Sequence, residues 1–246
     1  MPAAAELVIK APEGLSFDAR RHRYTLRGVA LPSVTTVLNV LDKPALAQWR
    51  VDQAVEAMRS AWSPDKPYTE GERDALLNGS RFAWRAVSGA AASKGKLAHE
   101  WIERHVYGTK QPDPTDPEVH AATNAFLEWE ASHDVEYLEH ELAVADPVHG
   151  YAGTLDSLIR YDGKIALLDL KTSKGIYAEY YLQLAAYEGA LATMLKKGKL
   201  DKRLIVRIPK DGGPVEVVTV ERDVKADIRA FLGALELYRW SKGNGD

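Results

Sequence analysis

The sequence has no cysteine and no long apolar run, and both absences restrict the class of protein it can be. Without cysteine there are no disulfide bonds, cysteine zinc sites or cysteine-ligated iron–sulfur clusters, and a cytoplasmic setting is favoured. No apolar stretch approaches the roughly 18 residues of a membrane helix. The start of the chain also lacks the basic and apolar segments of a signal peptide. We therefore expect a cytoplasmic protein with no membrane partner.

An excess of positive charge is also missing, since the formal net charge is −3. The chain as a whole thus lacks the basic signature of many nucleic-acid-binding proteins. Two local basic clusters remain: an early one of Arg20, Arg21, His22, Arg23 and Arg27, and a late one of Lys196, Lys197, Lys199, Lys202, Arg203 and Arg207. A solvated surface explains each cluster taken alone. A role in contacting phosphates would require both clusters to flank one cleft.

What is present is an ordinary globular composition, with 46% hydrophobic residues among 246, enough for one sizeable core. Extended segments come first, and helical periodicity then dominates up to Gly108, with breaks at Pro44 and in the loop 63–67. The remaining pattern is a helix over 118–132, strands within 135–144 and 151–171, a helix over 176–197, a hairpin within 204–220 and a helix over 223–240. This order predicts an α/β fold with helices flanking a mixed central β-sheet. We expect residues 1–92 to form an N-terminal hairpin and helical portion packed on a core of residues 93–246, as one compact domain overall.

A two-residue turn signal, Asp-Gly at 162–163, lies between two strand patterns. It predicts a tight type I′ hairpin. The register of such a hairpin places Asp156 directly opposite Asp169, with their Cβ atoms about 5 Å apart. Lys171 falls on the same face, because side chains alternate along a strand.

Two carboxylates placed in this way repel each other. At an effective dielectric constant of about 20, the Coulomb energy at about 5 Å is roughly 3 kcal/mol. A divalent cation would offset that repulsion, and hard oxygen ligands suit Mg²⁺ or Mn²⁺. The alternative is an exposed hairpin whose scattered charges are solvated.

Two pairs of residues at helical spacing add to this hypothesis. His99 and Glu103 are four residues apart and would project from one helix face. They would form either a surface ion pair or, for His99, a metal ligand that favours Mn²⁺ over Mg²⁺. Gln183 and Tyr187 are also four apart, and they would either pack the helix or reach a substrate near the metal.

Four short motifs in order resemble those of the PD-(D/E)XK nuclease superfamily, in its RecB-like, phage exonuclease-type branch. They are Gly95 to Glu103, Gly153 to Asp156, Asp169 to Thr172, and Gln183 to Tyr187. Together they span roughly residues 93–190, and a weaker likeness to phage members begins at Leu31. The resemblance implies a restriction-endonuclease-like fold. It departs from some relatives, which hold an iron–sulfur cluster with four cysteines, so no such cluster is expected here.

The resemblance also implies roles for individual residues. The metal, Mg²⁺ or Mn²⁺, would be bound by His99, Asp156, Asp169 and the backbone carbonyl of Leu170. Lys171 would act with the two aspartates in catalysis by positioning the attacking water. Further residues would serve the site in lesser ways: Gln183 and Tyr187 by contacting substrate or supporting the site, and Glu103 and Glu141 in an outer role.

The implied function is a metal-dependent DNA nuclease that hydrolyses phosphodiester bonds. An exonuclease acting on DNA ends in phage or prophage recombination or repair is favoured. Its expected partners are single- or double-stranded DNA ends and a phage recombination or single-strand-binding protein. The alternatives are a structure-selective or nicking endonuclease with the same site, and a non-catalytic DNA-binding module.

Overall fold

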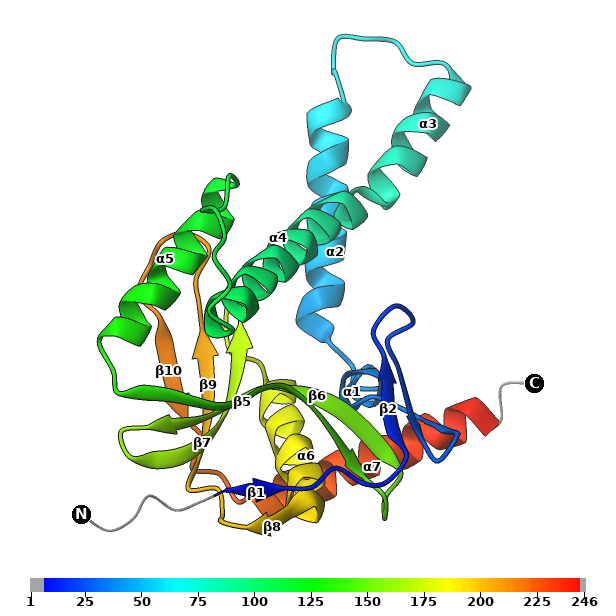
Figure 1. The fold of residues 1–246 in the computed structure, drawn as a ribbon. Coiled ribbons are helices and arrows are strands. Elements are labelled where there is room, and N and C mark those ends of the chain that lie inside the picture. The colour runs from blue at the N-terminus through cyan, green and yellow to red at the C-terminus, as the bar shows by residue number, and fades with distance from the viewer. Residues whose placement is uncertain (1–6, 244–246) are drawn as a thin grey trace. The chain divides into compact units, whose positions relative to one another are not determined.

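The computed structural model describes residues 7–243, which form two compact units (Figure 1). The sheet unit comprises the chain up to Leu41 and from Ala98 onward, and the helical unit comprises Asp42–Leu97. This grouping differs from the division predicted at residue 92, because the N-terminal strands belong with the sheet. Within residues 7–243, none of the helices combines the length and apolar character needed to cross a membrane.

The helical unit contains α2 (Pro44–Ala61), α3 (Glu70–Arg81) and the first part of α4 (Ala83–Val106). Pro44 does more than interrupt the preceding helix, because it occupies the first turn of α2. A capping box between Thr69 and Glu72 begins α3.

The helical periodicity between the loop 63–67 and Gly108 contains a break that the sequence analysis does not predict. The backbone leaves the helical region at Phe82 (φ −113°, ψ 10°), which separates α3 from α4. Gly108, at φ +65°, follows α4 as predicted.

The sheet unit is built on five strands in the order β10–β9–β7–β6–β5. Their bounds are β5 Val135–Asp146, β6 Tyr151–Tyr161, β7 Lys164–Lys171, β9 Lys202–Arg207 and β10 Glu216–Thr219. β7 and β9 are parallel, and the other neighbours are antiparallel. The predicted mixed central sheet is therefore confirmed.

Helices cover both faces of this sheet, as the alternation along β7 requires. Leu168 and Leu170 enter one core, with Phe126 of α5 (Pro117–Ala131) and Ile102 near the end of α4. Leu167 enters the other core, whose helices are α1 (Val34–Leu38), α6 (Ala178–Met194) and α7 (Val224–Gly243). This arrangement confirms the fold class.

Two small sheets complete the unit. β2 (Leu15–Asp18), β3 (Arg23–Leu26) and β4 (Val29–Leu31) form an antiparallel sheet of their own. β1 (Val8–Ile9) pairs with β8 (Leu195–Lys197). The helix predicted over 176–197 therefore ends earlier, at Met194, because the last residues of that range pair with β1 as a strand.

The hairpin of β6 and β7 has the predicted register from Tyr161↔Lys164 to Ser157↔Leu168. Its turn residues Asp162 (φ 49°) and Gly163 (φ 73°) both have the positive φ of a type I′ turn.

We predict that Gly163→Ala lowers the free energy of unfolding by about 1 kcal/mol, because an L-residue is strained in the left-handed region. A Cβ at this position would meet nothing within 4 Å, so backbone strain is the only cost. Gly233→Ala in α7 is a matched control that also meets nothing, and it should stabilise by roughly 0.5–1 kcal/mol. Urea denaturation measures both, and equal effects of the two substitutions would contradict the strain argument.

Candidate active site

The candidate site lies where β6 and β7 part, on the face of the sheet that α6 covers. Asp169 and Lys171 follow Leu167 at alternate positions of β7, so they share its face. Backbone pairing of β6 with β7 ends one position before Asp156 and Asp169. Asp156 instead turns its Oδ2 to the backbone N–H of Leu170, which donates to it at 2.6 Å.

The acid pair is thus brought together, but not as the regular ladder pair that the register predicts. Leu155 and Leu158 both enter the α6-side core, so strict alternation along β6 is broken around Asp156. The side chain of Asp156 takes over from the ladder at that point by accepting the N–H of Leu170.

Asp169 is a buried carboxylate with little to satisfy it. It is 1% exposed, and within residues 7–243 its oxygens have no hydrogen-bond donor besides the Lys171 ammonium. The ammonium of Lys171 forms an ion pair with its Oδ2, and the Lys171 side chain is 14% exposed. The same ammonium lies 5.0 Å from the centroid of the Tyr180 ring. A buried carboxylate with this little satisfaction is costly for stability.

The pKa values of the cluster express the same conflict. Burial raises the pKa of Asp169 to about 6; Lys171 opposes the rise and the charge of Asp156 adds to it. Burial also raises the pKa of Asp156, again opposed by Lys171. Burial acts to lower the pKa of Lys171, but the facing Asp169 and Asp156 outweigh it and raise that pKa. Lys171 is therefore charged at neutral pH.

His99 reaches this cluster from α4. Burial lowers the pKa of its imidazole to about 4, and the charge of Lys171 lowers it further against the opposing effect of Asp169. The ring is therefore neutral at pH 7, which is the form that binds metals. Within residues 7–243 His99 forms no ion pair with Glu103, so the structure does not support the surface ion pair considered from the sequence.

Glu141 lies on β5 opposite Asp156, between the pairs His140↔Ser157 and Leu142↔Leu155. Its φ of +49° is unusual for a residue other than glycine and locally redirects the strand. Glu141 keeps solvent contact at the rim of the site. Partial desolvation, with the Asp156 and Glu103 carboxylates, raises its pKa to about 8. Glu141 thus lies near Asp156, and Glu103 lies near Glu141.

Gln183 and Tyr187 form a second layer beneath the acids. The Gln183 side-chain amide donates to the Tyr187 hydroxyl at 2.9 Å, and Tyr187 is 4% exposed. A Cβ on Gly153 would lie 2.6 Å from Cε1 of Tyr187, so only glycine permits this close approach. Burial raises the pKa of Tyr187 well above its usual value, and Asp169 adds to the rise. Of the two proposed roles, support of the site suits this buried phenol better than substrate contact.

Sequence reasoning missed two tyrosines at the site. Tyr180 lies against Lys171, and Tyr24 shares a 2.7 Å hydrogen bond with Thr154, two residues before Asp156. Tyr180 lies three residues before Gln183. Its closeness to that motif in the sequence could have indicated a place at the site. No sequence signal joins Tyr24 to Thr154, because 130 positions separate them.

The carboxylate and imidazole groups of the site are suitable ligands for a hard divalent cation. Their side chains, however, do not converge on a single point. Among residues 7–243, no group of three or more His, Asp or Glu side chains is arranged to hold a metal ion. In the described part of the chain the Asp169 oxygens have no donor besides Lys171, the Asp156 carboxylate is nearby, and His99 is neutral. A cation would have to compete with Lys171 for Asp169.

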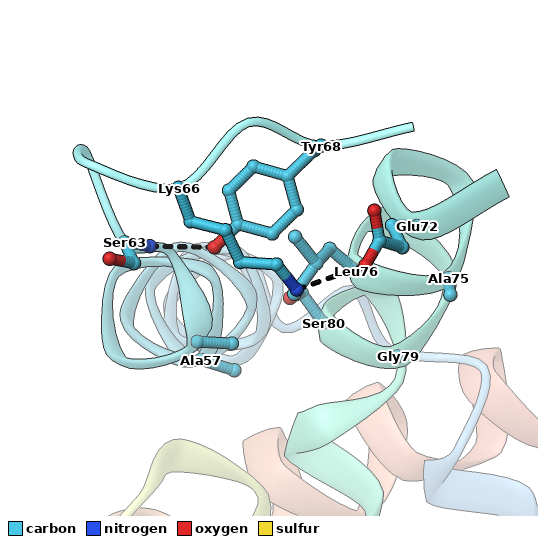
Figure 2. Close-up of a pocket in the computed structure, with 10 residues that line it drawn as sticks. Ala57, Ser63, Lys66, Tyr68, Glu72, Ala75, Leu76, Gly79 and Ser80 are labelled. Atoms are coloured by element: carbon cyan, nitrogen blue, oxygen red, sulfur yellow. Dashed lines mark hydrogen bonds and ion pairs between the residues drawn. The ribbon is translucent and has the colours of Figure 1, made fainter. Parts of the chain in front are cut away.

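A separate cavity of about 700 Å³ lies between α2 and α3 in the helical unit (Figure 2). Small residues, among them Ala57, Ala75 and Gly79, line it. Figure 2 shows Lys66 passing over it to Glu72, at 2.9 Å, from the loop that also carries Tyr68. Its lining contains one carboxylate, already paired with a lysine, so it lacks the acid pair that distinguishes the sheet site.

Comparisons with known proteins add little to these residues. No family model and no curated protein matches the chain. Among solved structures, an alkaline exonuclease (LHK-Exo) from Laribacter hongkongensis is 18% identical with a TM-score of 0.31, covering 61% of this chain and 84% of its own. The same enzyme in complex with dAMP gives 19% identity, a TM-score of 0.30 and the same coverage. SSO0001 is 16% identical with a TM-score of 0.31, covering 78% of this chain and 86% of its own. At these TM-scores the likeness carries no functional argument, which rests on the site itself.

We predict that Asp169 makes stability depend on pH. Its pKa of about 6, against 3.8 for an unperturbed aspartate, means that the folded state binds a proton more tightly than the unfolded chain. The free energy of unfolding should therefore fall by about 2 kcal/mol as pH rises from about 4 to about 6, out of about 3 kcal/mol over the whole titration. Asp169→Asn removes this dependence. Urea denaturation in EDTA across that range should show the difference between wild type and variant changing, and a constant difference would refute the prediction.

Proposed function

We propose that this protein is a metal-dependent deoxyribonuclease that uses Asp156, Asp169 and Lys171. The observation that carries the proposal is the buried Asp169 and the half-buried Asp156, held with the largely buried ammonium of Lys171 where two strands part. This arrangement opposes stability, since burial raises the pKa values of both carboxylates and the charge of Asp156 adds to the rise at Asp169. Groups with pKa values perturbed in this way are typical of sites that bind ions or perform chemistry.

Mg²⁺ or Mn²⁺ is the cofactor that this donor set favours. Asp156, Asp169 and neutral His99 would hold it, with the backbone carbonyl of Leu170 as a further ligand. When bound, such an ion would polarise the scissile phosphate and lower the pKa of a bound water. Imidazole accepts Mn²⁺ more readily than Mg²⁺, so Mn²⁺ is the better first probe.

The protein itself would supply a positive charge at the reacting phosphate and the residues that hold this charge in place. Lys171 stays protonated because two carboxylates face it, and the Tyr180 ring packs beside its ammonium. A positive charge fixed at this place stabilises the negative charge that develops on a phosphate under attack. Tyr187, held by Gln183, supports the acids from below. Glu141 and Glu103 would act at the rim.

An exonuclease acting on DNA ends is the form of this activity that the motif resemblance favours, in phage or prophage recombination or repair. A phage recombination or single-strand-binding protein would then be the partner. A structure-selective or nicking endonuclease would use the same residues. A non-catalytic module is less favoured, because this chain keeps both aspartates and the lysine.

We predict that Lys171→Ala lowers the rate of DNA cleavage in Mn²⁺ by at least about 10²-fold, the usual cost of losing a charge that stabilises the transition state. Lys164→Ala, exposed at the opposite end of β7, is the control and should cleave like wild type. Circular dichroism checks that both variants fold. Cleavage by Lys171→Ala at the wild-type rate would remove the proposed mechanism.

The same assay separates the alternatives when linear and covalently closed circular DNA are compared. An exonuclease digests the linear DNA and leaves the closed circle intact. Cleavage of the circle assigns an endonuclease instead. Retained DNA binding without any metal-dependent cleavage would favour the non-catalytic module.

We predict that Mn²⁺ raises the thermal midpoint of the wild type, because an ion that binds only the folded state stabilises it. Asp169→Asn should lose most of this rise, since a neutral amide is a poor ligand for a hard cation. Lys164→Ala should keep it. An equal rise in wild type and Asp169→Asn would show that the ion binds elsewhere, whatever the cleavage assay shows.

A further inference from the structure

Three members of the late basic cluster lie close to acidic side chains of the sheet unit. Arg203 is 8% exposed and its Nε lies 3.2 Å from Glu188. Arg207 pairs with Glu216 at 2.7 Å, and the Lys199 ammonium lies 3.8 Å from Asp201. These three charges are balanced by acids, so the late cluster offers less free positive charge for phosphates than its six residues indicate.

The early basic cluster is different, because much of its charge is unbalanced. It lies at the turn between β2 and β3, where Asp18 is the only acid. Asp18 accepts the backbone N–H groups of Arg20 and Arg21 and lies 3.9 Å from the Arg21 side chain. Within residues 7–243 the guanidinium groups of Arg20 and Arg23 form no ion pair, and both residues are exposed.

This turn is anchored to the candidate active site. Tyr24 follows Arg23 directly, and its hydroxyl shares a 2.7 Å hydrogen bond with Thr154. Thr154 lies two residues before Asp156 on β6. Tyr24 is 1% exposed and belongs to a small core with Ala145 and Ala152, which fixes the hairpin to the sheet. Figure 1 shows the hairpin beside α1, within the same unit.

Two further aromatic rings extend from Tyr24 towards the surface of the hairpin. Phe17 pairs with Tyr24 across the hairpin and stacks on its ring, with centroids 4.5 Å apart. The His22 ring meets Phe17 edge-on at 5.5 Å. Phe17 is 37% exposed, so part of its ring is open to a ligand. The same hairpin thus carries the exposed Arg20 and Arg23 and a partly exposed aromatic ring. Cationic groups together with an exposed aromatic ring are the combination that binds single-stranded nucleic acid, through phosphates and stacked bases.

We infer that the β2–β3 hairpin binds the DNA strand that leads to the site, with Arg20 and Arg23 on its phosphates and Phe17 against a base. This inference rests on the proposed nuclease function, because that function is what makes the bound DNA strand lead to Asp156 and Asp169. It adds a substrate-binding element that lies outside the four sequence motifs.

The test measures binding of a fluorescein-labelled 20-nucleotide DNA, single-stranded or as a duplex, by anisotropy in EDTA at several salt concentrations. The wild type is compared with R20A/R23A, R20K/R23K and K225A/R229A, the last removing two exposed charges of α7. R20A/R23A should weaken binding and reduce the slope of log K against log salt by about 1.4 to 1.8, for two lost phosphate contacts. R20K/R23K should keep most of the slope, and K225A/R229A all of it.

Phe17→Ala separates stacking from charge. It should weaken single-strand binding about fivefold or more and leave the salt slope unchanged, because the ring carries no charge. Thermal melts identify any variant whose fold is damaged, and in that case Phe17→Leu replaces it.

The inference is overturned if R20A/R23A binds DNA like the wild type, if K225A/R229A loses as much slope, or if the wild type does not bind. Unchanged DNA binding in R20A/R23A would assign the arginines to solvent or to another anionic partner. Cleavage in Mn²⁺ is scored separately. Hairpin-dependent binding without cleavage would refute only the nuclease function, and cleavage with hairpin-independent binding would refute only this inference.

Discussion

The repulsion between Asp156 and Asp169 is the constraint around which the sheet unit is arranged. Both carboxylates are held at the point where β6 leaves β7, and within residues 7–243 Asp169 has no hydrogen-bond donor besides Lys171. Lys171 offsets part of the repulsion, yet the pKa values of both acids stay raised. A fold optimised for stability alone would place apolar side chains here, as it does at Leu167 and Leu168 on the same strand. The cost is consistent with selection for chemistry.

The layers around the sheet serve this cluster in different ways. α4 supplies His99 from the layer whose core includes Ala98 and Ile102. α6 supplies Tyr187, which fits against Gly153 because no side chain separates them. The β2–β3 hairpin, through Tyr24, holds the segment that precedes Asp156. Residues far apart in the chain thus fix the geometry of two aspartates and a lysine.

The elements near the site were largely predictable, and the errors have physical causes. Asp-Gly at 162–163 gave the hairpin register correctly, because a two-residue turn leaves one pairing. The predicted backbone pairing does not continue to Asp156. There the Asp156 side chain accepts a hydrogen bond from the Leu170 N–H in place of the regular ladder. Local periodicity predicts a helix through Leu195–Lys197. The prediction fails because these residues pair with β1, far away in the sequence, and that pairing overrides the local pattern. The break at Phe82 has no proline beside it, and Gly79, three residues earlier, still lies inside α3.

The sequence by itself determined the mixed sheet, the tight hairpin and the shared face of Asp169 and Lys171, because turn chemistry and alternation act over neighbouring residues. Only the tertiary structure decided which of two basic clusters remains open, since ion pairs such as Arg203 with Glu188 form between distant elements. It also decided that His99 is neutral, because burial and the charge of Lys171 depend on packing. Protonation and exposure are properties of the assembled environment, and residue order alone does not specify them.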